Sequence, residues 1–156
     1  LYTFSKSYAM CGFRIGYVVA PKNLSESIIE SSHFLTISPP HISQLIAIKA
    51  LSLPNRHIDR MVRAYDRRRK YLVKRLNEMN LITKEPKGAF YVFSNIKYVT
   101  RKSSYDFSRD LLNKAKVAVV PGTEFGNYGE GYIRFSYATK LFLIKKALGR
   151  IENYLK

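Results

Sequence analysis

The feature that most constrains the fold is a long amphipathic pattern between Arg56 and Asn80. Apolar residues form one stripe of this pattern, and basic side chains such as Arg60, Arg67 and Lys74 occupy much of the helical surface outside the stripe. The pattern therefore predicts one long helix with a buried face and a solvated, positively charged face. Apolar residues recur along it at three- and four-residue steps, as one stripe of a helix requires: Ile58, Met61, Val62, Tyr65, Leu72, Leu76 and Met79.

Shorter patterns follow this helix to the end of the chain. The order helix–strand–strand–helix–strand–strand–helix predicts a small sheet with helices packed on it, an α+β domain. Ser103 or Ser104 is expected to cap the middle helix, and Thr139 the last one. The predicted strands cover residues 81–86, 88–94, 117–122 and 131–138, and the predicted helices cover 103–116 and 139–156.

The first part of the chain contains fewer elements. Residues 1–4 are typical of a strand end, and the apolar run Ile15–Ala20 is typical of a buried strand. Helices are expected at residues 23–35, with Asn23 as N-cap, and at 41–53, where the mostly apolar sequence indicates burial on more than one side. These elements are too few to cover both faces of the apolar strand, so we expect a larger α/β sheet beyond them.

Composition limits the function classes. A chain that is 46% hydrophobic and 13% aromatic is expected to fold, and no apolar run approaches the roughly 18 residues of a membrane span. The lone cysteine, Cys11, favours a reducing compartment, so we expect a cytoplasmic protein without a membrane partner. The net charge of +16 fits either a polyanionic partner or a protein that handles small anions. No nucleic-acid-binding motif accompanies the basic residues, so no nucleic-acid partner is expected.

The stretch "TFSKSYAMCGFRIGY" concentrates chemically useful side chains. Lys6 follows a predicted strand end, and such a lysine amine can serve as a nucleophile toward carbonyl groups. The hydroxyls of Thr3 and Ser5 and the planar guanidinium of Arg14 are suited to phosphate oxygens. Each residue alone is unremarkable, but together they predict an amine nucleophile beside a phosphate site.

This stretch resembles the lysine signature of class I/II aminotransferases, which are pyridoxal-phosphate enzymes of fold type I similar to aspartate aminotransferase. Further stretches resemble that family's motifs in the family's order: "PKGAFYVF" matches its Pro-x-Gly-Ala-Phe-Tyr strand, "VAVVPGTEFG" its Val-x-Pro-Gly-x-x-Phe-Gly turn, and "GYIRFSYA" the strand with its substrate arginine. The resemblance spans nearly the whole chain.

The resemblance implies roles for individual residues. Lys6 would attach to pyridoxal phosphate and move the proton between the substrate's α-carbon and the cofactor. Arg14 and Thr3 would hold the cofactor phosphate, with Ser5 as a weaker candidate. Arg134 would grip the substrate's α-carboxylate with two hydrogen bonds.

Other residues receive no chemical role. Tyr91 and Phe125 are interpreted as site walls or packing, and no metal site is expected. His33, His41 and His57 match no functional position of the family and are interpreted as structural or exposed.

The resemblance also predicts the organisation of the chain. We expect the C-terminal part of the fold type I fold, with residues 1–53 as the tail of the large cofactor-binding α/β domain and 54–156 as a bridging helix and small α+β domain. The aspartate, tyrosine, asparagine and ring-stacking residue that the family uses around the cofactor find no match, and the chain alone is expected to be inactive.

Two functions remain open from the sequence. In the first, the chain is part of an aminotransferase, which exchanges an amino group between an amino acid and a 2-oxo acid. Aspartate and 2-oxoglutarate are the default substrates by family frequency, and a homodimer is the expected assembly. The alternative is an inactive truncated module whose basic helix binds nucleic acid or an acidic partner. Lys6, Arg14 and Arg134 together favour the first, because a binding module needs none of them.

Overall fold

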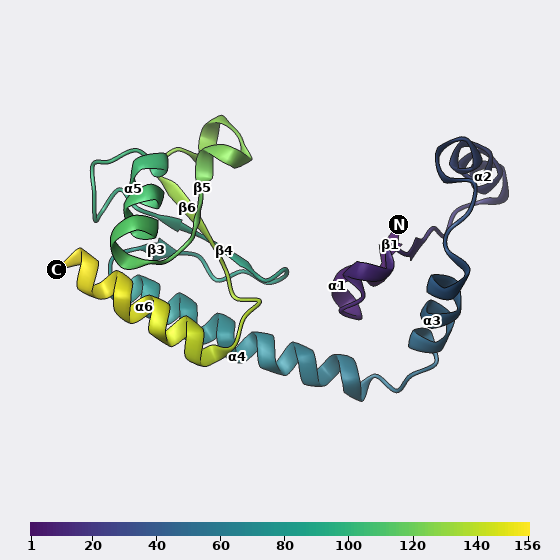
Figure 1. The fold of residues 1–156 in the computed structure, drawn as a ribbon, viewed down its shortest axis with the longest axis horizontal. Coiled ribbons are helices and arrows are strands. Elements are labelled where there is room, and N and C mark those ends of the chain that lie inside the picture. The colour runs from purple at the N-terminus through teal and green to yellow at the C-terminus, as the bar shows by residue number, and fades with distance from the viewer. The chain divides into compact units, whose positions relative to one another are not determined.

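The computed structural model describes residues 1–156, which form two compact units (Figure 1). The N-terminal unit comprises Leu1–Met61 and the C-terminal unit comprises Val62–Lys156. The predicted division after residue 53 refers to the domains of a whole aminotransferase and stays a prediction. None of the helices is both long and apolar enough to span a membrane.

The C-terminal unit is built from three main helices and four strands, in the order that the sequence predicts. Its elements are α4 (Arg56–Glu78, which begins in the N-terminal unit), β3 (Ile82–Thr83), β4 (Tyr91–Asn95), α5 (Ser104–Asp110), η2 (Leu111–Ala115), β5 (Val120–Pro121), η3 (Gly122–Phe125), η4 (Asn127–Gly129), β6 (Tyr132–Ser136) and α6 (Leu141–Leu155).

The sheet of this unit is antiparallel throughout, with strand order β3-β4-β6-β5. In the central pair, Phe93 of β4 lies opposite Arg134 of β6, and Tyr91 lies opposite Ser136. Successive side chains of a strand point to opposite faces. One face of the sheet is therefore buried, whereas Tyr91, Phe93 and Arg134 share the other face.

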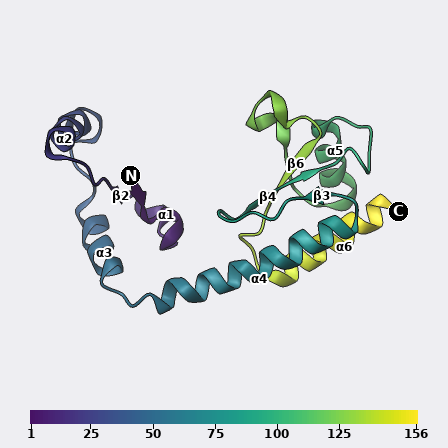
Figure 2. The same ribbon diagram turned by 180° about the vertical axis from the view of Figure 1, so that it is seen from behind.

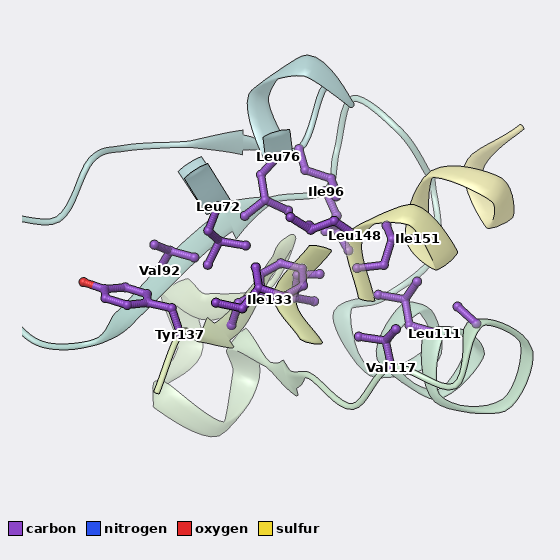
Figure 3. Close-up of a cluster of buried hydrophobic side chains, with 14 of the residues drawn as sticks. Leu72, Leu76, Val92, Ile96, Leu111, Val117, Ile133, Tyr137, Leu148 and Ile151 are labelled. Carbon is purple, nitrogen blue, oxygen red and sulfur yellow. The ribbon is translucent and has the colours of Figure 1, made fainter. Parts of the chain in front are cut away.

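The helices cover the buried face and close a single core. Leu76 of α4, Ile133 of β6 and Ile151 of α6 are completely buried in it (Figure 3). Helices α4 and α6 run side by side in both views (Figures 1 and 2), joined by an Arg75–Glu152 ion pair of 2.9 Å. The prediction of helices packed on a small sheet is confirmed.

Ser103 is the residue that caps α5. Its side chain accepts a hydrogen bond from the backbone N–H of Asp106 at 3.0 Å, so the predicted serine cap is confirmed. Neighbouring Ser104 is fully buried, and its hydroxyl accepts hydrogen bonds from the backbone N–H groups of Gly131 and Tyr132. These bonds tie α5 to the start of β6, the strand that carries Arg134.

Asp110, at the end of α5, forms a polar cluster at the edge of the core. Its carboxylate accepts hydrogen bonds from Lys102, from the hydroxyl of Tyr154 at 3.0 Å and from Lys114 at 3.3 Å. These donors, Lys102 first, lower the pKa of Asp110 from 3.8 to about 2. The cluster links α5 to α6 through a carboxylate that favours its charged form.

This cluster predicts a component of acid sensitivity. A carboxylate whose folded pKa is lowered stabilises the fold above the unfolded pKa, and the stabilisation is lost as pH falls through the folded pKa. Between pH 4 and pH 2, the urea midpoint of the chain is therefore expected to fall more steeply than that of Asp110→Asn. Asp59→Asn, which removes a carboxylate without an ion pair, is the control and should keep the steep slope. Equal slopes for the parent chain and Asp110→Asn would contradict the assignment.

The N-terminal unit contains short elements followed by two helices. A small core of Phe4, Met10, Ala47 and Ala50 packs helix α3 (His41–Leu51) against the turn that carries Lys6. The elements are β1 (Tyr2–Thr3), α1 (Phe4–Ser7), η1 (Cys11–Phe13), β2 (Gly16–Tyr17), α2 (Lys22–Thr36) and α3 (His41–Leu51).

Burial in this unit differs from the sequence prediction. Of the apolar run 15–20, only Gly16–Tyr17 is strand, and Val19 is 74% exposed. Strand β2 pairs only with β1, and its Tyr17, although in contact with the rings of Tyr2 and Phe4, stays 41% exposed. Helix α3 likewise exposes Ile42 and Ile48, although burial on several sides was predicted. The exposure of residues 15–20 agrees with the expectation that this chain's own elements are too few to cover the strand. The predicted burial of α3 on more than one side is wrong for this chain, because its elements bury only one side of that helix.

Two predicted helix caps are also wrong. Helix α2 begins at Lys22 after Pro21, so Asn23 lies inside the first turn and not at the N-cap. Helix α6 begins at Leu141, with Lys140 at the N-cap position and no capping side chain. Both predicted caps, Asn23 and Thr139, lie within two residues of the actual position. The backbone N–H of Ser25 donates to the carbonyl of Pro21 at 2.9 Å, so the first turn of α2 already closes on Pro21.

The difference in burial predicts a difference in local stability. Backbone amides of β4 and β6 are expected to exchange with solvent far more slowly than amides of residues 15–20 in the monomeric chain, because only the former lie in a covered sheet. Hydrogen–deuterium exchange followed by mass spectrometry measures this. Comparable protection of all three segments in a verified monomer would contradict the expectation.

Candidate functional site

Lys6 lies on a one-turn helix directly after a strand. Thr3 is the N-cap of that helix: its hydroxyl oxygen accepts a hydrogen bond from the backbone N–H of Ser5 at 3.1 Å. The Thr3 hydroxyl proton remains available for a second acceptor. Thr3 thus shapes the turn that presents Lys6 and can still donate a hydrogen bond.

The turn rests on a buried anchor. Phe4 is only 3% exposed, and its backbone N–H donates to the carbonyl of Ile15 at 3.3 Å. The carbonyl of Phe4 in turn accepts hydrogen bonds from the backbone N–H groups of Tyr8 and Met10. Lys6 itself is exposed. The arrangement is an exposed amine on a backbone that its neighbours hold in place.

Arg14 lies between η1 and β2, the strand that pairs with β1 beside the Lys6 turn. Its backbone is left-handed (φ 49°, ψ 51°), and its guanidinium donates to the carbonyl of Cys11 at 3.1 Å. Two residues later, Gly16 pairs with Thr3, and a Cβ at Gly16 would lie 2.6 Å from the carbonyl oxygen of Tyr2. Only glycine allows this close pairing, which brings the Arg14 segment beside Thr3.

The electrostatics of this turn favour an anion. The first acidic residue of the chain is Glu26, so residues 1–17 contribute two cations, Lys6 and Arg14, and no carboxylate. A hydroxyl, a guanidinium and an amine form a donor set typical of phosphate sites. We refer to Thr3, Lys6 and Arg14 as the phosphate turn.

Arg134 belongs to the C-terminal unit and lies on the face of the sheet opposite the core. Its guanidinium carbon lies 4.3 Å from the ring centre of Tyr91 and 4.4 Å from that of Phe125. No carboxylate of the chain lies within ion-pair distance of Arg134. This arginine is held by aromatic rings and keeps its hydrogen-bond donors for another partner.

Thr3, Ser5, Lys6 and Arg14 all lie in the N-terminal unit, whereas Arg134 lies in the other unit. The aromatic contacts to Arg134 were not predicted. The signal was present, because Tyr91 and Phe125 fall within the quoted motifs. The sequence does not reveal, however, that their rings lie against the guanidinium. The structure contains no group of three or more histidine, cysteine, aspartate or glutamate side chains placed to hold a metal.

Comparison with known families decides what this arrangement belongs to. The family model described as "Aminotransferase class I and II" matches residues 1–151. The chain belongs to the class I and II aminotransferases.

Relatives of this aminotransferase chain share its sequence closely. It is 45% identical to an aspartate aminotransferase of Pyrococcus abyssi and 44% identical to aromatic-amino-acid aminotransferase 2 of Thermococcus litoralis, in each case over 98% of the chain and 40% of the relative. The chain thus spans about two fifths of the length of these curated relatives.

Solved structures show the same fold. An aromatic aminotransferase from Pyrococcus horikoshii, 44% identical, superimposes with a TM-score of 0.91 over 97% of this chain and 41% of that one. An aspartate aminotransferase from Thermotoga maritima, 34% identical, superimposes with a TM-score of 0.86 over 97% of this chain and 38% of that one. The prediction that this aminotransferase chain corresponds to a C-terminal portion of the fold type I fold is confirmed.

Proposed function

We propose that this chain is the part of a pyridoxal-phosphate-dependent aminotransferase that carries the cofactor's lysine, Lys6, and the arginine for the substrate carboxylate, Arg134. The observation that carries the proposal is the phosphate turn, with its hydroxyl, amine and guanidinium and no carboxylate, in a chain that the aminotransferase family model matches almost throughout. A basic binding module would need neither this turn nor an unpaired arginine.

The residues present fit the cofactor's phosphate and aldehyde. Arg14 and Thr3 are the groups that would hold the phosphate, because a guanidinium and a hydroxyl donate hydrogen bonds to phosphate oxygens. The Thr3 oxygen already accepts from the Ser5 amide, and its hydroxyl proton remains available to donate to a phosphate oxygen. Ser5 is half-buried and remains the weaker candidate.

The proposed division of labour follows from the chemistry of each side chain. When bound, pyridoxal phosphate supplies an electron sink for negative charge at the substrate's α-carbon. Lys6 supplies the amine that attaches the cofactor and afterwards carries the proton to and from that carbon. The exposed position of Lys6 on an anchored turn suits an amine that must first bind and then move a proton.

Arg134 would orient the substrate. A guanidinium binds a carboxylate through two parallel N–H···O bonds, a planar contact that fixes both position and rotation of the α-carboxylate. An arginine without a carboxylate partner in its own chain is available for that role. Arg134 thereby presents the α-carbon of the substrate for proton transfer.

Substrates and assembly are part of the same proposal. Aspartate with 2-oxoglutarate remains our default pair, supported by relatives that are named aspartate aminotransferases. Other relatives are named for aromatic amino acids or for (5-formylfuran-3-yl)methyl phosphate, so similarity alone does not select the substrate. We further propose a cytoplasmic homodimer without a nucleic-acid or membrane partner, as is usual for such metabolic enzymes.

The proposal is tested on a complete enzyme that carries this chain. We expect visible absorbance of bound pyridoxal phosphate, which an amino-acid donor bleaches and a 2-oxo acid restores. Aspartate, phenylalanine and alanine are compared as donors at equal concentration. Failure of every amino acid to change the absorbance of the cofactor-loaded protein would overturn the proposed function.

The 156-residue chain alone is expected to bind pyridoxal phosphate only weakly. The phosphate turn offers donors for the phosphate, but none of the chain's acidic residues matches the motif of the aspartate that the family places at the pyridine nitrogen. Titration of the chain with the cofactor, followed by absorbance, measures the affinity, with Arg14→Ala as the control that should weaken even the residual binding. Tight, spectroscopically normal binding by this chain would contradict the expectation.

A further inference from the structure

We propose that Tyr91 and Phe125 are positioning residues, whose rings hold the Arg134 guanidinium in one plane and thereby set its affinity for a carboxylate. The inference rests on the proposed function of Arg134 as the carboxylate-binding arginine. It assigns to two aromatic residues a role in substrate binding that neither the sequence nor the family match provides.

The rings approach the guanidinium from different elements. Tyr91 comes from β4, where it lies diagonally across from Arg134, since Arg134 pairs with Phe93 in the register. Phe125 comes from η3, the turn that follows β5. Both ring centres lie within 4.4 Å of the guanidinium carbon, yet the rings form no contact with each other. They therefore occupy different sides of Arg134.

The two rings are themselves supported. Tyr91 contacts Phe90, with ring centres 4.5 Å apart, and Phe125 meets the edge of Phe93 at 5.9 Å. Phe93 in turn stacks on Tyr132 at 5.4 Å. Phe125 is thus supported by an aromatic row on the open face of the sheet, whereas Tyr91 is supported by Phe90, which packs against the core.

Such contacts leave the useful edge of arginine open. A guanidinium is planar and stacks on aromatic faces, while its N–H donors point outward within the plane. A carboxylate binds at that edge through two hydrogen bonds. Stacking and carboxylate binding therefore use different parts of the group, and the rings can restrict the side chain's rotation before the substrate arrives.

The position of Arg134 argues against simple core packing. It lies on the face of the sheet away from the core, where a long arginine side chain would ordinarily sample many rotamers. No carboxylate in the chain restrains it, so the rings are its main restraint. A restrained arginine loses less entropy on binding a carboxylate than a mobile one.

The test compares variants of the chain itself. Phe125→Leu and Tyr91→Leu remove one ring each, while Phe125→Tyr keeps the ring and should preserve the behaviour of the parent chain. Phe142→Leu, an exposed phenylalanine of α6, is the matched control. The readouts are the ¹⁵N order parameter of Arg134 Nε–H and its rate of modification by phenylglyoxal, mapped by peptide mass spectrometry, with thermal melting to verify folding.

We expect the leucine variants to lower the order parameter and to raise the modification rate of Arg134 by about three- to tenfold, in line with the strength of cation–π contacts. Phe125→Tyr and Phe142→Leu should change neither. An unchanged Arg134 in folded Phe125→Leu and Tyr91→Leu variants would overturn the proposal. Neither readout involves catalysis, so this outcome is independent of the proposed function.

The complete enzyme separates the two ideas further. In it, Phe125→Leu is expected to raise KM for the amino acid by about three- to tenfold with kcat little changed, because binding and not proton transfer is weakened. A mobile Arg134 together with an unaltered KM would overturn the link to substrate. Absence of transamination in the parent enzyme would instead refute the proposed function, while the chain-level readouts still judge the aromatic contacts.

Discussion

Replacement of Lys6 by alanine in the complete enzyme is expected to lower kcat by at least about 10²- to 10⁴-fold, the range for loss of a positioned general acid–base group. The reason is that Lys6 is the amine of the phosphate turn and no other lysine lies in residues 1–21. Loss of the covalent attachment adds to that effect, so the lower bound is conservative.

The measurement combines steady-state kinetics with the visible spectrum. Lys6→Ala should still bind the cofactor through Arg14 and Thr3, but with a spectrum that lacks the covalently attached form. Lys22→Ala, at a lysine that is 91% exposed and pairs with Glu26, is the control and should behave as the parent enzyme does. Full activity of Lys6→Ala would remove Lys6 from the mechanism.

Arg134→Ala is expected to weaken binding of the amino-acid substrate by about 2–5 kcal/mol, the usual loss when one partner of a desolvated charge pair is truncated. The loss should fall mainly on kcat/KM, because the α-carboxylate loses its two-point contact. Cofactor binding should change little, since Arg134 is not part of the phosphate turn.

Two further variants sharpen the assignment. Arg134→Lys should restore only part of the efficiency, because an ammonium group cannot form the planar two-point contact. Arg109→Ala is the matched control: Arg109 also lies over a tyrosine ring, at 5.8 Å from Tyr105, but pairs with Asp106. Unaltered kinetics of Arg134→Ala with an amino-acid donor would rule out its proposed role.

The C-terminal unit could be predicted because its elements bury one another. The apolar stripe of α4 places Leu72 and Leu76 in the core that the unit's own sheet and α6 complete. In the C-terminal unit the local sequence patterns agree with the final packing, so the patterns alone predict its helices and strands. The order of helices and strands therefore followed from local sequence patterns.

The N-terminal unit shows where such reasoning stops. The apolar character of residues 15–20 indicates burial, but burial depends on what lies across the strand, and β2 has only β1 beside it. The missed caps have a local cause instead, since Asn23 and Thr139 each lie near a helix start with competing positions. Sequence patterns identify the presence of a helix or strand more reliably than they identify the residues at which it begins and ends.

The candidate site likewise has one part that the sequence indicated and another that only the structure reveals. Lys6, Thr3 and Arg14 lie within twelve residues of one another in sequence, so the sequence alone already indicated one candidate site, which stays a prediction. The rings on Arg134 come from β4 and η3: the register of β4 with β6 brings Tyr91 to Arg134, and the turn after β5 brings Phe125 to it. Contacts that depend on register are not visible in a single sequence.

The most direct test of the central claim is the chemical identity of the lysine that carries the cofactor. The complete enzyme is loaded with pyridoxal phosphate, treated with borohydride to make the attachment permanent, digested and analysed by tandem mass spectrometry. We predict that the phosphopyridoxyl group is found on Lys6, in the peptide that also contains Ser5 and Ser7. A label on any other lysine, with Lys6 unmodified, would contradict the account.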